Sequence, residues 1–110
     1  MKVKEKGHTI HLHDSQSSMD ELIEKITTQH VQFKNFNLIV DVSRATPIEA
    51  KTLKKFKTLQ KTHQKGKKSF VLVVTDTDFT EVDESITVVP TLLEAHDIIE
   101  MEEIERDLGF

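Results

Sequence analysis

Hydrophobic positions along the chain fall into short groups, and their spacing alternates between that of strands and that of helices. Residues 3–6 and 9–13 are two strand-like segments on either side of Gly7, which predicts a hairpin. Strand alternation places Ile10 and Leu12 on one face of the sheet and the polar side chains of the same segment on the other. The chain is therefore expected to open with two antiparallel strands.

Continuous apolar runs at residues 38–42 and 70–74 are typical of strands buried on both faces, and residues 86–89 predict a shorter last strand. Ser18 and Glu21 form a capping box, and the hydrophobic residues that follow at helical spacing predict a helix over residues 19–30.

Thr46 and Glu49 form a second capping box, with Pro47 at the first helical position, which predicts a helix over residues 47–64 that Gly66 ends. Residues 75–85 leave room for one short helical turn, and a final helix should follow Thr91. Apolar residues along that helix include Leu92, Ala95, Ile98, Met101, Ile104 and Leu108.

Strands separated by helices of about a dozen residues imply parallel pairing with right-handed crossovers. We therefore predict an α/β fold with a small, mixed, mainly parallel sheet, an N-terminal hairpin and three to four packed helices. The chain has 110 residues, which is the size of one domain, so residues 1–110 should form a single domain.

The composition of the chain is ordinary for a soluble globular protein, with 36% hydrophobic and 31% charged residues. It has no apolar run near the roughly 20 residues that span a bilayer, and no apolar stretch follows its N-terminal lysines. It also lacks cysteine, which excludes disulfides and thiolate chemistry and is compatible with a reducing compartment. We expect a cytoplasmic protein with no membrane association and no cofactor.

The net charge of −4 hides a strong separation of charge along the chain. Between residues 51 and 68 there are eight lysines and no acid, whereas residues 91–108 hold seven acids and one arginine. We expect two solvated helix faces, with a bipolar docking surface as the alternative. Opposite charges of this kind would also allow two copies to pair, so we expect a monomer or a weak homodimer.

The order of elements resembles the STAS domain of anti-sigma factor antagonists and sulfate transporters. The matching segments are the hairpin, the strands FNLIVDVS and KSFVLVVT, and the ending ITVVPTLLEAHDIIEMEEI. The last 23 residues, VVPTLLEAHDIIEMEEIERDLGF, are similar to short STAS-like bacterial proteins encoded beside ribonuclease Z. The resemblance implies a non-enzymatic regulatory module whose partner is an anti-sigma kinase-like protein or ribonuclease Z.

The resemblance also implies that partners dock on the second helix and the loop before it. The residues predicted to form this surface are Ser43, Arg44, Thr46, Glu49, Lys51, Thr52, Lys54 and Lys55. The Asp-Ser-Ser-Gly segment that carries the phosphorylated serine of anti-sigma factor antagonists falls near residues 49–52, where this chain has no serine and no glycine. Thr46 and Thr52 remain as candidate phosphorylation sites, and Glu49 could supply a permanent negative charge or simply cap the helix.

Histidines are concentrated in the segment HTIHLHD, where His11 and His13 share a strand face and could together hold a metal ion. Catalytic zinc needs three fixed protein ligands and an open position. Two histidines fall short of this, so we predict no metal site and interpret the segment as an exposed strand face.

Two alternative functions remain open. Asp41, Asp76 and Asp78 follow two central strands and could bind Mg²⁺ in a small phosphate-handling enzyme. The lysine-rich second helix could instead contact RNA through phosphates, although all six aromatic residues are phenylalanines, four of which fit the core. We expect nucleic acid at most as a secondary partner.

Overall fold

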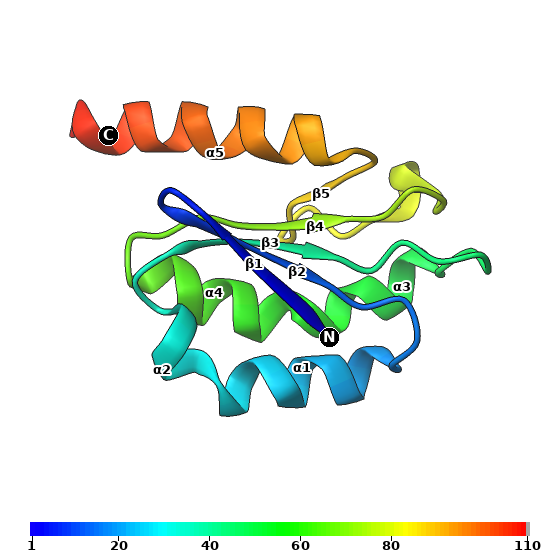
Figure 1. Cartoon of the computed structure of the whole chain (residues 1–110). Helices are drawn as coiled ribbons and strands as arrows, with labels where there is room; N and C mark the ends of the chain where they lie inside the picture. Colours follow the sequence, from blue (N-terminus) through cyan, green and yellow to red (C-terminus); the bar gives the residue numbers. More distant parts are fainter. Residues whose placement is uncertain (110) are drawn as a thin grey trace.

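One sheet forms the centre of the computed structural model, which describes residues 1–109, and its strands lie side by side in chain order. The first two strands pair antiparallel and every later pair is parallel (Figure 1). The strands are β1 (Lys2–Lys6), β2 (Thr9–His13), β3 (Asn37–Asp41), β4 (Phe70–Val73) and β5 (Val88–Val89). The predicted α/β fold, with its mixed sheet and N-terminal hairpin, is confirmed.

Helices cover both faces of this sheet. One face carries α1 (Met19–Thr28), α2 (His30–Phe33), α3 (Ala50–Leu53), the 3-10 turn η1 (Lys54–Phe56) and α4 (Lys57–Lys65). The other face carries α5 (Leu92–Asp107), as Figure 1 shows. The short turn η2 (Phe79–Glu81) lies in the connection between β4 and β5, where a helical turn was expected. Among the described residues, no helix is long and apolar enough to cross a membrane.

Alternation along the central strands creates two apolar layers. In β3, Leu38 and Val40 face the larger core beneath α1 to α4, which also contains Leu53 and Phe56. Ile39 faces the smaller core beneath α5. Leu38, Ile39 and Val40 are all 0% exposed, so the strand is buried on both faces, as the continuous apolar run predicted.

The first helix begins where its capping signal indicated. The Ser18 hydroxyl accepts a hydrogen bond from the Glu21 amide at 3.1 Å, and Met19 is the first helical residue. The helix ends at Thr28, however, and a separate short helix begins at His30. The predicted helix over residues 19–30 is therefore two helices.

The second capping prediction is wrong. The helix begins at Ala50, and Glu49 occupies the N-cap position without a side-chain hydrogen bond, so Thr46 and Pro47 lie in a loop. Tertiary contacts explain this, because the backbone of Ile48 is already bonded outside any helix. Its amide donates to the Asp76 carbonyl at 3.3 Å, and its carbonyl accepts from the Thr77 hydroxyl at 2.7 Å.

Two other predicted elements differ in extent. The helix expected over residues 47–64 is divided into α3, η1 and α4, although it still buries Leu53, Phe56 and Leu59 and ends before Gly66. The last strand covers only Val88–Val89, because it pairs only with Leu72 and Val73 at the end of β4.

Candidate functional site

The loop over residues 43–49 leaves the carboxyl end of β3, and its base is held by hydrogen bonds. The Ser43 amide donates to the Asp41 carboxylate at 3.0 Å, and the Ser43 hydroxyl accepts from the Thr75 amide at 3.1 Å. These bonds link the base of the loop to the ends of β3 and β4. Ser43 was predicted to contact a partner, but in the structure it holds the base of the loop.

Arg44 holds the base of the same loop through three hydrogen bonds. Its guanidinium donates to three backbone carbonyls, those of Val42 at 2.9 Å, Ser17 at 2.9 Å and Asp14 at 3.1 Å. Two of these acceptors belong to the turn before α1, so Arg44 joins that turn to the loop after β3. The rigid, forked guanidinium suits this role because it can serve several acceptors at once. Sequence reasoning placed Arg44 on the docking surface and did not anticipate these bonds.

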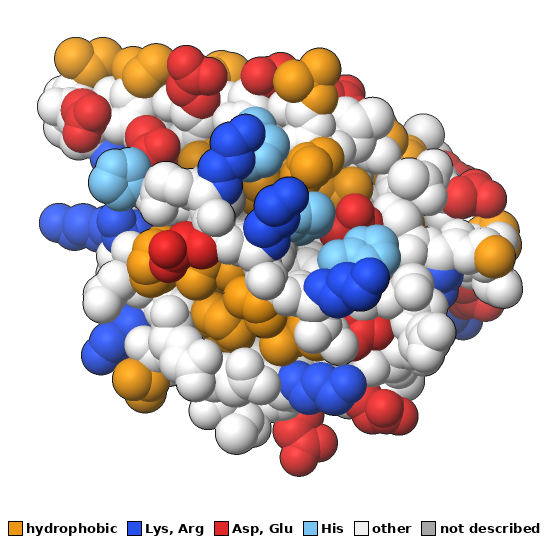
Figure 2. Space-filling model, in the orientation of Figure 1, with side chains coloured by type: hydrophobic (Ala, Val, Ile, Leu, Met, Phe, Trp, Pro, Cys, Tyr) orange, Lys and Arg blue, Asp and Glu red, His pale blue; other side chains and the backbone are white. Residues whose placement is uncertain are grey.

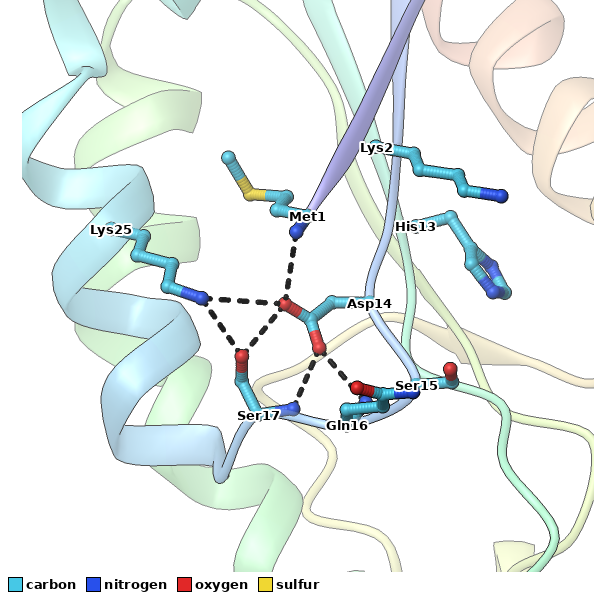
Figure 3. Close-up of a pocket in the computed structure, with 8 residues that line it drawn as sticks. All are labelled: Met1, Lys2, His13, Asp14, Ser15, Gln16, Ser17 and Lys25. Atoms are coloured by element: carbon cyan, nitrogen blue, oxygen red, sulfur yellow. Dashed lines mark hydrogen bonds and ion pairs between the residues drawn. The ribbon is translucent and has the colours of Figure 1, made fainter.

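Asp14 organises the turn before α1, beneath a hollow of about 410 Å³ (Figure 3). Its buried carboxylate accepts from the amides of Gln16 and Ser17 at 3.0 and 2.8 Å and from the Ser17 hydroxyl at 2.9 Å. The Met1 ammonium and the Lys25 ammonium lie 3.6 and 3.8 Å from it. In Figure 3, these two cations lie beside the carboxylate.

The pKa of Asp14 reflects this turn. Burial by itself would raise the pKa, but the hydrogen bonds from Ser17 and Gln16 and the charge of the amino terminus outweigh burial and lower the pKa to about 2. Asp14 is therefore ionised at neutral pH and is engaged on both oxygens by its own chain. Its contacts give it a structural role at the base of the hollow.

The tip of the loop contrasts with its base. Ala45, Thr46 and Pro47 are exposed, and Thr46 is thus accessible to solvent. Thr52, the other candidate for phosphorylation, is half-buried in α3. The loop therefore presents a short exposed segment from a base that is anchored on two sides.

Three lysines predicted to contact a partner follow this loop in sequence, on α3 and η1. Each pairs with an acid: Lys51 with Glu49 at 3.3 Å, Lys54 with Asp83 at 3.6 Å, and Lys55 with Asp20 at 3.0 Å. The lysine side chains are 49 to 85% exposed, so these pairs are solvated and contribute little to stability. Their ammonium groups remain accessible to an acidic partner.

Asp83 was not singled out from the sequence. Hydrogen bonds from the Ser85 hydroxyl and amide lower its pKa to about 2, with a smaller contribution from Lys54. Asp83 therefore stays ionised next to Lys54 over the whole neutral range.

His11 and His13 share one strand face, as expected, and both approach the carboxylate of Asp41. Its Oδ2 lies 3.9 Å from His11 Nε2 and 3.5 Å from His13 Nδ1. Burial lowers the pKa of His11, and the opposing attraction of Asp41 is smaller. Figure 2 shows histidine and lysine side chains gathered over the hairpin. This segment is a partly covered strand face beside α5.

The three aspartates proposed to bind Mg²⁺ have separate local roles. Asp41 faces the two histidines, the Asp76 backbone receives the bond from Ile48, and Asp78 caps η2 by accepting from Thr80. Over residues 1–109, no three His, Asp or Glu side chains are placed to hold a metal ion. The carboxylate site considered as an alternative is therefore not assembled within residues 1–109.

Comparison with protein families and curated proteins identified no relative of this chain. No protein-family model matches the chain, and no curated protein sequence is significantly similar to it.

Proposed function

We propose that the protein is a non-enzymatic interaction module that docks a protein partner on the tip of the loop over residues 43–49 and on the adjoining lysines of α3 and η1. The observation that carries the proposal is the contrast within this loop. Its base is held by the three hydrogen bonds of Arg44, whereas Ala45, Thr46 and Pro47 are exposed. A loop ordered in advance loses less entropy on binding, which favours recognition of a partner.

Charge indicates what kind of partner surface would fit. Lys51 and Lys54 are 85 and 60% exposed, and each pairs with one acid, Glu49 and Asp83 respectively. An acidic patch on the partner can replace those weak pairs and speed the encounter. The resemblance to STAS domains favours an anti-sigma kinase-like protein or ribonuclease Z as that partner.

The loop also offers a place for regulation. Thr46 lies at the exposed tip, and a phosphate there would bring nearly two negative charges next to the lysines. Phosphorylation of Thr46 would then neutralise the docking surface and release an acidic partner. The half-buried position of Thr52 makes it the less accessible of the two candidates.

The test compares the double variant Lys51→Glu and Lys54→Glu with a matched double variant, Lys61→Glu and Lys65→Glu, on the exposed side of α4. Both change the net charge equally. The proteins are immobilised and incubated with native lysate, and retained proteins are identified by mass spectrometry. One specific protein should be retained by the wild type and the α4 variant and lost by the first variant.

Two results would contradict the proposal. Undiminished retention by Lys51→Glu with Lys54→Glu would remove this surface from consideration. Retention that disappears after nuclease treatment, and falls steeply with salt, would point to the lysine-rich helices as an RNA-binding surface instead.

A further inference from the structure

The helix α5 has apolar side chains on two opposite sides. On the inner side, Ala95 and Ile99 are 0 and 3% exposed and pack against Ile39 and Val71 of the sheet. On the outer side, four apolar side chains are between 53 and 72% exposed. These four residues, Leu93, Met101, Ile104 and Leu108, form what we call the outer strip.

Spacing places the outer strip along one line of the helix. Met101, Ile104 and Leu108 follow one another at steps of three and four residues, which brings them to the same face. Leu93 lies eleven residues before Ile104, which is close to three full turns, so it shares the same face, with Asp97 between them. At 1.5 Å per residue, the strip runs for about 22 Å. Single exposed apolar residues are ordinary on a surface, but a row on one helix face is typical of a helix that packs against another helix.

Acidic side chains border this strip on both sides. Figure 2 shows apolar and acidic groups alternating along the helix at the top of the molecule. Five acids on α5 are exposed, namely Glu94, Asp97, Glu100, Glu105 and Asp107. Within Leu92–Asp107, the only basic side chain besides His96 is Arg106, which is half-buried and donates to Ser69 and Asn37. The rim of the strip is therefore negative.

The helix is held firmly at both ends. At its start, the Thr91 hydroxyl accepts from the Glu94 amide at 3.2 Å and donates to the Glu94 carboxylate at 2.8 Å. Near its end, Arg106 binds the Ser69 hydroxyl at 3.2 Å and the Asn37 side-chain oxygen at 3.3 Å. The strip is thus a fixed surface that a partner can meet without reordering it.

We propose that the outer strip of α5 docks a basic amphipathic helix from another protein. Apolar residues of that helix at steps of three and four would cover Met101, Ile104 and Leu108. Lysines or arginines on its flanks would face the acids that border the strip, in the manner of interhelical pairs beside a coiled-coil seam. This surface lies on the opposite face of the sheet from α3 and η1, whose lysines carry the proposed function, so the two can be occupied together.

Charge argues against a second copy of this chain as the occupant. Two α5 helices packed on their outer strips would bring five acids from each into one interface. The lysine-rich α4 would supply the opposite charge but no apolar counterpart. Its exposed side chains are Thr58, Lys61, Thr62, Gln64 and Lys65.

The experiment uses two synthetic helical peptides labelled with fluorescein. Both carry leucines at the a and d positions of about three heptads, and the flanking positions are lysine in one peptide and glutamate in the other. Fluorescence anisotropy is measured for the wild type, for Met101→Gln with Ile104→Gln, and for Val31→Gln. Val31 is a suitable control because it is 75% exposed on α2, in the opposite helical layer.

The wild type and Val31→Gln should bind the lysine peptide equally, and the double variant should bind it at least about tenfold more weakly. The glutamate peptide should bind the wild type at least about tenfold more weakly than the lysine peptide does, and salt should reduce this difference. The loop variant Lys51→Glu with Lys54→Glu should keep full binding, which separates this test from that of the proposed function.

Equal binding of both peptides would mean unspecific adhesion and would overturn the proposal, as would unchanged binding by Met101→Gln with Ile104→Gln. Sedimentation velocity tests whether a second copy of this chain occupies the outer strip instead. A concentration-dependent dimer that the same double variant abolishes would identify the strip as a self-association surface and refute a basic partner.

Discussion

Acidification should destabilise the protein partly through His63, the histidine of α4, which is 1% exposed. Its Nε2 lies 2.6 Å from the carbonyl oxygen of Phe36, and since a carbonyl only accepts, Nε2 carries the hydrogen. Its Nδ1 is buried and has no hydrogen-bond partner. A second proton would therefore sit on a buried Nδ1 that has no acceptor.

The direction of the pKa shift follows from these contacts. Burial lowers the pKa of His63 below its ordinary value of 6.5, the bond to Phe36 opposes this, and His30 and Lys68 lower it further. The unfolded chain then binds the proton more readily than the folded one. The stability that His63 contributes is complete above pH 6.5 and is lost as pH falls towards the lower folded pKa.

The size of the loss is bounded. One titrating group changes the free energy of unfolding by at most about 1.4 kcal/mol per pH unit within that window. Between about pH 7.5 and pH 5.5, His63 should thus remove up to about 1.4 kcal/mol, because only the last of the two units lies below the ordinary pKa.

Urea denaturation of the wild type and of His63→Gln at these two pH values measures this contribution. Other titrating groups act alike in both proteins and cancel in the difference, so the wild type should lose more stability than the variant. Equal losses in the two proteins would refute the reasoning. So would an imidazole pKa of 6.5 or more for His63 in a magnetic resonance titration of the folded protein.

Three further perturbations follow from the contacts at the ends of the sheet. Arg44→Ala removes three hydrogen bonds from a cationic donor and should lower the free energy of unfolding by about 3 kcal/mol in urea; a loss below about 1 kcal/mol would contradict the anchoring role. Asp14→Asn should lower the free energy of unfolding by about 2 kcal/mol at pH 7, because the wild-type pKa of about 2 lies well below 3.8. The wild type should lose this contribution as pH falls from 3.8 towards 2. An acid titration in which the two proteins keep the same difference in stability would contradict this prediction. Thr91→Ala should lower the stability by about 1 kcal/mol in thermal unfolding, because it removes the hydroxyl that caps α5. Thr91→Ser keeps a hydroxyl and should restore most of this stability; a serine variant as unstable as the alanine variant would contradict the capping role.

Local patterns predicted the elements whose stability is local. The buried runs of β3 and β4 and the Ser18 cap of α1 appear where the sequence indicated them, because burial on both faces and capping are encoded within a few residues. The start of α3 was missed for the opposite reason. Thr46 and Glu49 have the right types for a cap, but the backbone of Ile48 is bonded to the segment over residues 76–77, far along the chain.

The candidate site shows the same division. That polar residues would follow the buried strand β3 was visible in the sequence, and so was the shared face of His11 and His13. The anchoring role of Arg44 was not visible, since two of its acceptors lie 27 and 30 residues earlier in the chain. For α5, the sequence did not show which side of the helix would pack on the sheet. Its apolar residues were expected, but periodicity alone does not distinguish a side that packs on the sheet from a side that faces solvent.

The order of the strands has a consequence for how the chain folds. Each strand of the sheet pairs with the strand that precedes it in sequence, so the sheet can grow from β1 to β5 while the chain is being synthesised. Every step then closes one loop between neighbouring elements, which keeps the entropic cost of each step small. The bonds of Arg106 to Ser69 and Asn37 span the longest separations, 37 and 69 residues. Because Arg106 lies in the last helix, these bonds can close only after all five strands have been synthesised.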